Sequence, residues 1–538
     1  MRKLIWVLCI AAAFSGAAAA DEGHHHEEVT QDQLGTVHFP VSCTPDAQKT
    51  FEKGVALLHS FWYEEAEKTF LDVEKQDPKC AMAYWGEAMS LWHQLWNHPD
   101  SATIERASAE LKKANKVKAP TDRERDYIEA LKAFYSNSKK ADNDVRARAY
   151  SAAMEKVYQK YPDDHEAAAF YALSLLASEP DNDTTFANRK QAGAILEKLF
   201  DVEPNHPGIA HYLIHTYDKP QLAQLGLPAA RRYAQIAPAA PHALHMPSHI
   251  FARLGLWQDD IHSNLASIAA TRKATEMHMG GEGHQFHAMD YLVYAYLQSG
   301  READALKVIE EVKAMPPMKD MYGMGYDPRT YALVAFPARY ALEMHHWAEA
   351  ASLTPVPDAQ TGDAGITYWA RAIGAARSGN VAQARTDIEH IEAIHKTLLD
   401  QKKKSFAEAV DQDRREAAAW LDHAQGKNDE ATAALRAIAE KQEASGDESD
   451  NETPAREMLA DMLLEMKRPE QALIEYKTGL RFFPNRFNSL YGAAQAAEMA
   501  GQASEATEYY AVLVKTCEGS NSLRPELAKA KQAVVAQK

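Results

Sequence analysis

Similar residues recur 34 positions apart in this chain, and this interval restricts the fold more than any other feature. Three residues near the C-terminus have counterparts 34 positions later: Ala460 and Ala494, Ala472 and Ala506, and Tyr476 and Tyr510. An interval of this length is typical of a repeated helical unit that buries its apolar face only against its neighbours. Few segments alternate between polar and apolar residues as strands do. We therefore expect an all-α chain of stacked antiparallel helix pairs.

The repeat resembles the tetratricopeptide (TPR) pattern, in which fixed positions are small, apolar or proline. Residues 47–80 fill these positions with Gly54, Ala66, Phe70, Val73 and Pro78. A small residue lets the two helices cross closely, and proline ends the second helix. The chain thus resembles a TPR α-solenoid over most of its length after residue 46.

Four segments resemble, beyond single repeats, a group of large exported bacterial TPR proteins. They are LLHSFWYEEA (57–66), AMAYWGEAMSLW (81–92), HPGIAHYLIHTYD (206–218) and HALHMPSHIF (242–251). The resemblance implies the fold and export, and it implies no activity.

The first 20 residues have the pattern of a secretory signal peptide. The basic MRK is followed by the apolar LIWVLCIAAAF and then by small residues before Asp21. No later segment has the ~20 uninterrupted apolar residues that a membrane span needs. We expect an exported protein, periplasmic or secreted, without a transmembrane segment after cleavage.

Two aperiodic stretches, at 352–365 and 441–454, predict breaks in the helical array. We expect the following segments: a signal peptide (1–20), an N-terminal His/acidic tail and lead-in (21–46), a main TPR solenoid (47–350), a helical middle section (351–440), an acidic linker (441–454) and a C-terminal TPR pair (455–538).

Three cysteines follow the signal peptide: Cys43, Cys80 and Cys517. Cys43 directly precedes the first helix of one repeat, and Cys80 begins the first helix of the next. Those two helix ends lie on the same side of stacked helical hairpins. We predict a Cys43–Cys80 disulfide, which an exported compartment permits, and a free Cys517.

Two successive repeats carry a histidine pair in the same register. His211 and His215 precede His245 and His249 by 34 residues each. An H-x3-H pair puts two imidazoles on one helical face, which is a common two-ligand arrangement for Zn²⁺, Cu²⁺ or Ni²⁺. The alternative is that these histidines pack within the repeats and bond to backbone carbonyls. Asp218 and Asp290 are the candidate partners for the outer ring nitrogens.

Other residues extend this candidate metal site. His242 shares the helical stripe, and His284 and His287 follow a glycine-rich loop that could form a groove lip or an ordinary insertion. A methionine series every third residue could bind Cu(I) or could simply pack on the solenoid: Met315, Met318, Met321 and Met324. The tail histidines His24, His25 and His26 predict incidental metal affinity.

A second candidate surface is aromatic. Trp92, His93 and Trp96 stand where a helix should end, and aromatic residues in a concave groove suit peptide recognition. The net charge of −17 argues against a nucleic-acid partner. The sequence also lacks C-x-x-C-H, H-E-x-x-H, G-x-S-x-G and phosphate-loop motifs, and no catalytic residue stands out.

The sequence favours an exported TPR scaffold that binds a protein or peptide partner in its concave groove, with no enzymatic activity indicated. The alternative function is a periplasmic metal-binding protein, for copper or zinc, that uses the paired H-x3-H motifs. A metal-dependent hydrolase is the third hypothesis.

Overall fold

A computed structural model describes residues 29–96, 98–136, 138, 140–180, 183–280, 282–318, 327–446 and 453–536. Throughout this part of the chain the regular elements are helices, and it contains no strand. The chain is a TPR-like α-solenoid, which confirms the expected all-α fold class. The segment expected to be a signal peptide and the histidines of the tail lie outside the described residues.

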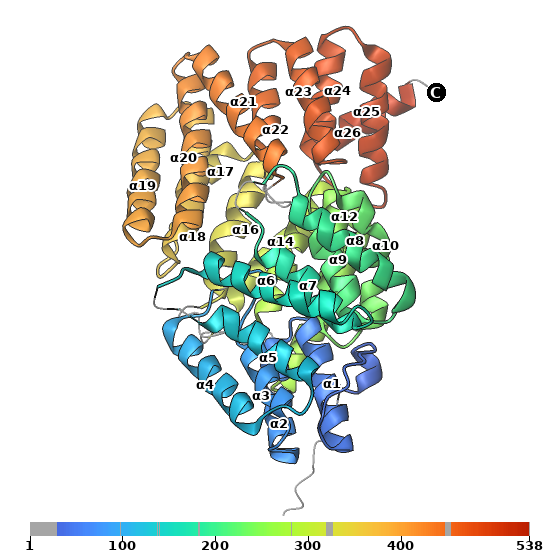
Figure 1. Cartoon of the computed structure of the whole chain (residues 1–538). Helices are drawn as coiled ribbons and strands as arrows, with labels where there is room; N and C mark the ends of the chain where they lie inside the picture. Colours follow the sequence, from blue (N-terminus) through green and yellow to red (C-terminus); the bar gives the residue numbers. More distant parts are fainter. Residues whose placement is uncertain are drawn as a thin grey trace, which may run out of the picture.

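Successive helices pack as antiparallel pairs along the whole chain (Figure 1). The first half contains, after the short 3-10 helix η1 (Gln31–Gln33), α1 (Pro45–His59), α2 (Tyr63–Gln76), α3 (Ala81–Ser90), α4 (Ser101–Val117), α5 (Asp122–Tyr135), α6 (Asn143–Lys160), α7 (His165–Ala177), α8 (Ala187–Val202), α9 (Pro207–Tyr217), α10 (Ala223–Ile236), α11 (Pro241–His245), α12 (Pro247–Arg253) and α13 (Trp257–Glu276). The second half contains α14 (Glu282–Gln298), α15 (Glu302–Ala314), α16 (Arg329–Glu343), α17 (Trp347–Ala351), α18 (Thr361–Arg377), α19 (Val381–Asp400), α20 (Lys404–Ala424), α21 (Asn428–Ser445), α22 (Ala455–Glu465), α23 (Pro469–Phe482), α24 (Phe487–Met499), α25 (Ala503–Thr516) and α26 (Pro525–Ala536).

The small repeat positions allow the close crossing that the sequence predicts. Phe70 of α2 packs against both Gly54 of α1 and Gly86 of α3. A Cβ atom on Gly54 would lie 2.8 Å from the Phe70 ring, which is closer than a Cβ approaches a neighbouring atom. Alanine at Gly54 would therefore push the two helices apart.

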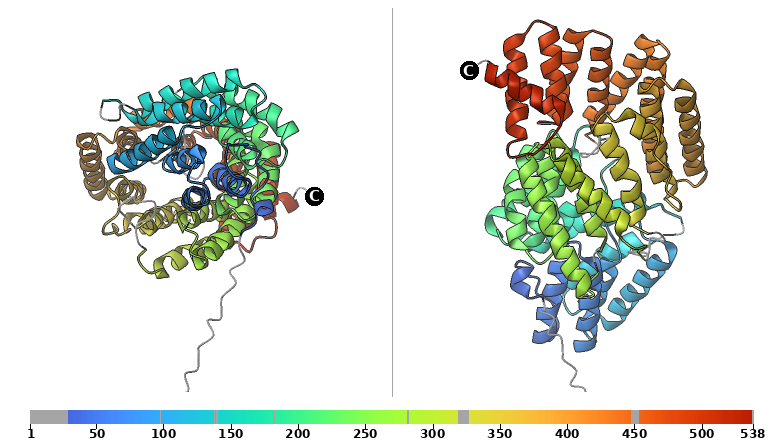
Figure 2. Two further views of the ribbon diagram at one scale, coloured as in Figure 1. Left: turned by 60° about the horizontal axis from the view of Figure 1, so that its bottom comes forward. Right: turned by 180° about the vertical axis from the view of Figure 1, so that it is seen from behind.

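The pairs wind into a superhelix, so that helices distant in the sequence become neighbours (Figure 2). Helix α1 contacts α9, and α14 contacts α24. At the second junction the Trp257 indole donates to the Asn485 carbonyl over 2.8 Å. The buried Arg486 guanidinium nearby bonds to Glu343 and Glu457. These contacts join the C-terminal repeats to the first half of the chain.

Two expected boundaries differ from the structure. The lead-in is part of the core, because the Phe39 ring is fully buried and packs against Phe51, Trp85 and Tyr127. Helix α21 continues to Ser445, so the beginning of the expected 441–454 linker is helical. Residues 447–452 of that linker lie outside the described part of the chain.

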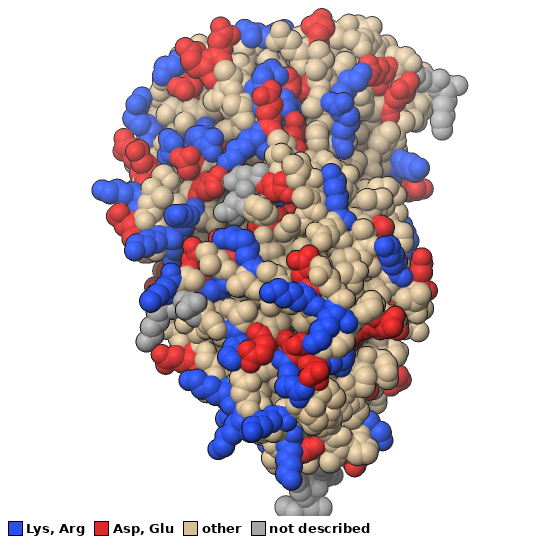
Figure 3. Space-filling model, in the orientation of Figure 1, with Lys and Arg blue, Asp and Glu red and all other residues tan. Residues whose placement is uncertain are grey.

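The surface seen in Figure 3 carries positive and negative side chains mixed together, without a broad region of one sign. None of the helices in the described segments combines the length and the apolar character that crossing a membrane requires.

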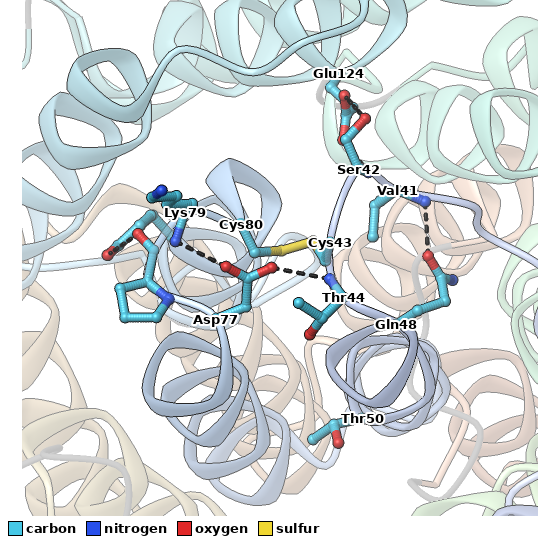
Figure 4. Close-up of a disulfide and its surroundings, with 12 residues drawn as sticks. Val41, Ser42, Cys43, Thr44, Gln48, Thr50, Asp77, Lys79, Cys80 and Glu124 are labelled. Carbon is cyan, nitrogen blue, oxygen red and sulfur yellow. Dashed lines mark hydrogen bonds between the residues drawn. A yellow bond between two sulfur atoms is a disulfide. The ribbon is translucent and has the colours of Figure 1, made fainter.

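A disulfide joins Cys43 to Cys80, as predicted, and Cys517 is free and buried (Figure 4). Asp77 fixes the residues next to both cysteines. Its carboxylate accepts hydrogen bonds from the backbone amides of Thr44 and Lys79 over 2.9 and 3.0 Å. The disulfide ties the start of α1 to the start of α3, across one repeat.

Removing this bond should destabilise the protein. The cysteines are 37 residues apart, and a closed loop of that length is worth ~3–4 kcal/mol on the chain-entropy estimate. The Cys43→Ser/Cys80→Ser double variant should therefore unfold at lower urea than the wild type, with circular dichroism as the readout. Cys517→Ser is the matched control and should change the midpoint less. Equal midpoints for the double variant and the wild type would contradict the prediction.

Candidate metal centre

Histidines from three successive first helices meet inside the superhelix. Helix α9 supplies His211 and His215, the pair α11–α12 supplies His242, His245 and His249, and α14 supplies His284 and His287. Pro247 divides α11 from α12 because it lacks an amide hydrogen. Met246 between them keeps helical dihedral angles, so His245 and His249 still lie on one face.

Six of these seven histidines form two groups of three. The first histidine set is His211, His215 and His242, and the second histidine set is His245, His249 and His287. Within each set, one nitrogen of every ring lies within 4.8 Å of the others. The sequence predicted that both H-x3-H pairs would contribute to one metal site. The structure instead gives each pair a third histidine from the next helix.

The first histidine set contains buried ring nitrogens without partners. His211 Nδ1 donates to the His59 carbonyl over 2.6 Å, which leaves its Nε2 with a free lone pair. Among the described residues, no hydrogen-bond partner exists for His211 Nε2, His215 Nε2 or either nitrogen of His242. Each buried polar atom of this kind costs about 1–3 kcal/mol, so four in one cluster are unusual for a packing role.

Two rings of the second histidine set, those of His245 and His249, have their outer nitrogens fixed by acceptors. His245 Nδ1 donates to Asn264 Oδ1 over 2.6 Å, and His249 Nδ1 donates to Asp218 Oδ2 over 2.9 Å. The two Nε2 atoms then face each other at 3.0 Å. That spacing fits either one proton between the nitrogens or one metal ion bound by both. Acceptors behind the ligating rings are the usual outer contacts of metal-bound histidines.

The surroundings keep these rings in the form that binds metal. Burial lowers the pKa of His211 to about 3 and that of His284 to about 3. Although burial opposes it, Arg253 and His249 hold the pKa of Asp218 well below its usual value. At neutral pH His211 and His284 are therefore neutral, which is the form of imidazole that binds metal, and Asp218 is charged.

Aromatic rings border the first histidine set. The Phe61 ring centroid lies 4.3, 5.6 and 5.7 Å from those of His211, His215 and His242. Its backbone φ of 53° is in the left-handed region, which an aromatic residue rarely occupies. The same left-handed turn recurs between the paired helices of other repeats, so it belongs to the repeat architecture. Trp96 lies beside His215 and His242 and is 39% exposed, so it stands between this set and solvent.

The remaining predicted residues divide between the site and the core. His284 lies beside His242, with ring centroids 4.8 Å apart. Trp92, expected on a binding surface, is 1% exposed and stacks on Phe134 in the core. His93 stacks on Tyr63. Asp290 pairs with Arg339, and its charge opposes the lowering of the His287 pKa.

The methionine series is only partly described. Met315 and Met318 pack against the hydrophobic core around α14 and α16, as the alternative interpretation expects. Met321 and Met324 lie outside the described residues, as do His24, His25 and His26.

Sequence reasoning missed a third histidine cluster beside the first set. Glu166 accepts from His59 Nε2 over 2.8 Å and from His206 Nε2 over 2.9 Å. The Tyr212 hydroxyl lies 2.7 Å from His59 Nδ1, and the Ile209 amide donates to His206 Nδ1. All four ring nitrogens are thus satisfied, which indicates a structural network. The three residues are too far apart in sequence to form a recognisable motif.

An acidic group lies in the first repeats. Glu74, Glu87 and Glu110 bring their carboxylates together. Burial, with the hydrogen bond and the repulsion from Glu87, raises the pKa of Glu74 to about 8. Glu74 is therefore protonated at neutral pH and shares its proton with Glu87, so we assign no ligand to this group.

Comparison with known proteins defines no family. No protein-family model matches the chain, and no curated protein matches it. Among solved structures, the human IFIT1 dimer with m7Gppp-AAAA is 14% identical, with a TM-score of 0.35, over 86% of this chain and 95% of that chain. A monomeric IFIT1 mutant with Gppp-AAAA is 13% identical, with a TM-score of 0.35, over 88% and 98% of the two chains. Likeness at this level says nothing about what this chain binds.

Metal-free protein should lose stability as the pH falls from 7.5 to 5.5. In the unfolded chain a histidine has a pKa of about 6.5, whereas His211 has a folded pKa of about 3. The unfolded state therefore binds more protons below pH 6.5, and stability is lost as the pH falls. Urea unfolding of EDTA-treated protein measures this. His211→Asn should show a shallower pH dependence, and an identical slope for both proteins would contradict the prediction.

Proposed function

We propose that this protein is an exported metal-binding repeat protein, in which each histidine set holds one transition-metal ion. The observation that carries the proposal is the group of unpartnered nitrogens in the first histidine set. Folding has buried these lone pairs together, and a bound cation would satisfy them at once.

The ring arrangement supports this function in both sets. Three imidazoles on one tetrahedral ion, with nitrogen–metal bonds of 2.0–2.1 Å, place their ring centroids about 5 Å apart. The centroid separations in the first set are 4.7, 5.0 and 6.3 Å. Those in the second set are 4.9, 4.4 and 5.4 Å. Both sets therefore approximate the tetrahedral arrangement, with the fourth position left for another ligand.

The chemistry of the ligands favours zinc or copper(II). Neutral imidazole suits these ions, whereas calcium and magnesium require oxygen ligands. Neither set contains a thioether or a thiolate that would select Cu(I). A hydrolytic role would require a general base, and Asp218 beside His249 is already bonded to Arg253.

The peptide-scaffold hypothesis receives less support from the same region. Of the residues predicted to form an aromatic surface, Trp92 lies in the core and Trp96 is well exposed.

Export remains part of our proposal and rests on the sequence of residues 1–20. Determination of the N-terminus of the mature protein should find Asp21.

Metal analysis tests the proposed function. The chain should carry no affinity tag, and His24, His25 and His26 should be replaced by asparagine to remove incidental binding. Stripped protein reloaded with Zn²⁺ or Cu²⁺ and dialysed should retain two ions per chain, measured by mass spectrometry. His249→Gln should retain one, because the second set would lose a ligand.

The matched control is His346→Gln, since the His346 side chain is exposed and hydrogen-bonds to the neighbouring Glu349. This variant should retain two ions. His206→Gln is the structural control, because it should lower the melting temperature without changing the metal count. Protein that retains no ion, or a His249→Gln variant with an unchanged count, would contradict the proposal.

A further inference from the structure

We propose that the two histidine sets form one dinuclear centre, whose ions are bridged by a small anion taken from solvent. This inference rests on the proposed function and deepens it, because it concerns how the two ions act together. It assigns the centre a ligand class: small anions such as hydroxide or azide that donate to two metals at once.

The distance between the sets carries the inference. Two ions about 3.5–4 Å apart, each with three imidazoles directed away from the other, place facing rings about 6–6.5 Å apart. The His242 and His245 centroids are 6.1 Å apart, and those of His215 and His249 are 6.3 Å apart. The largest separation within one set is also 6.3 Å. The sets are therefore as close as two halves of one bridged centre.

The charges of the site favour an anion as the bridging ligand. Two divalent ions would bring four positive charges among imidazoles, which bind metal in their neutral form. Asp218 contributes one negative charge through its bond to His249, but Arg253 already pairs with it. An anion between the ions would reduce this excess positive charge where the surroundings screen it weakly.

The environment also limits the size of the ligand. His287 is exposed, so solvent reaches the second set. At the first set the Phe61 and Trp96 rings stand over His215 and His242. A small anion that bridges the ions would leave these rings in place, whereas a bulky ligand would have to displace them.

Magnetic measurements on the copper-loaded protein test the inference. The full-length mature chain, with the three tail histidines replaced by asparagine, is loaded with two equivalents of Cu²⁺. A bridging ligand should couple the two unpaired spins antiferromagnetically. The electron paramagnetic resonance signal should then account for less than about one-tenth of the copper measured in the same sample. Azide should add a ligand-to-metal absorption band at one azide per two copper ions.

Variants separate the dinuclear centre from two independent ions. His249→Gln should keep one copper ion. Its electron paramagnetic resonance signal should account for all of that copper, because the second copper ion, to which its spin would couple, is absent. His287→Gln provides the same test at an exposed position where the substitution leaves the core intact. The control variant His346→Gln should show the same weak electron paramagnetic resonance signal as the wild type.

The outcomes distinguish the two proposals. Two bound copper ions with a signal that accounts for both would overturn the dinuclear inference and leave the proposed function standing. Protein that binds no copper and no zinc would overturn the proposed function, and the inference with it.

Discussion

The close stacking of successive first helices is the constraint on which the site depends. Residues 34 positions apart occupy equivalent places in neighbouring repeats, so the pair His211 and His215 lies beside the pair His245 and His249. The His211 and His245 side chains are fully buried, and burial lowers the pKa of both rings. A scaffold that only needed packing would fill such positions with apolar residues.

The winding of the superhelix also brings a helix from the beginning of the chain against the histidine sets. Helix α1 packs against α9, and Gly208 allows the His59 ring to approach closely, because a Cβ there would lie 2.5 Å from His59 Nδ1. His59 in turn bonds to Glu166 and offers its carbonyl to His211 Nδ1. The satisfied network of His59, Glu166 and His206 thus fixes which nitrogen of His211 is free. Satisfied and unsatisfied histidines stand side by side, which argues that the difference is functional.

The sequence predicted the parts of the structure that depend on local periodicity. The 34-residue interval predicted the helix pairs. The positions of Cys43 and Cys80 beside helix ends predicted the disulfide between them. The shared register of the histidine pairs follows from the same interval. Asp218 was anticipated as an outer partner, and it bonds to His249.

What the sequence did not predict depends on the winding of the superhelix. His242 and His287 complete separate sets because three consecutive first helices, rather than two, face one interior. The contact of α1 with α9 joins residues more than 140 positions apart, and no local pattern encodes it. The prediction for Trp92 was wrong for a related reason. A residue just beyond a helix end was expected at the surface, but Phe134 of the next helix pair covers the Trp92 ring. Burial across repeats is a property of the assembled solenoid.

The central claim is that two histidine sets hold two adjacent metal ions, and anomalous diffraction tests it most directly. Crystals of the metal-loaded protein, measured on both sides of the zinc or copper absorption edge, would locate the ions independently of the protein atoms. The account predicts two anomalous peaks about 3.5–4 Å apart, one among His211, His215 and His242 and one among His245, His249 and His287. Crystals of fully loaded protein that show no anomalous peak among these six histidines would contradict it.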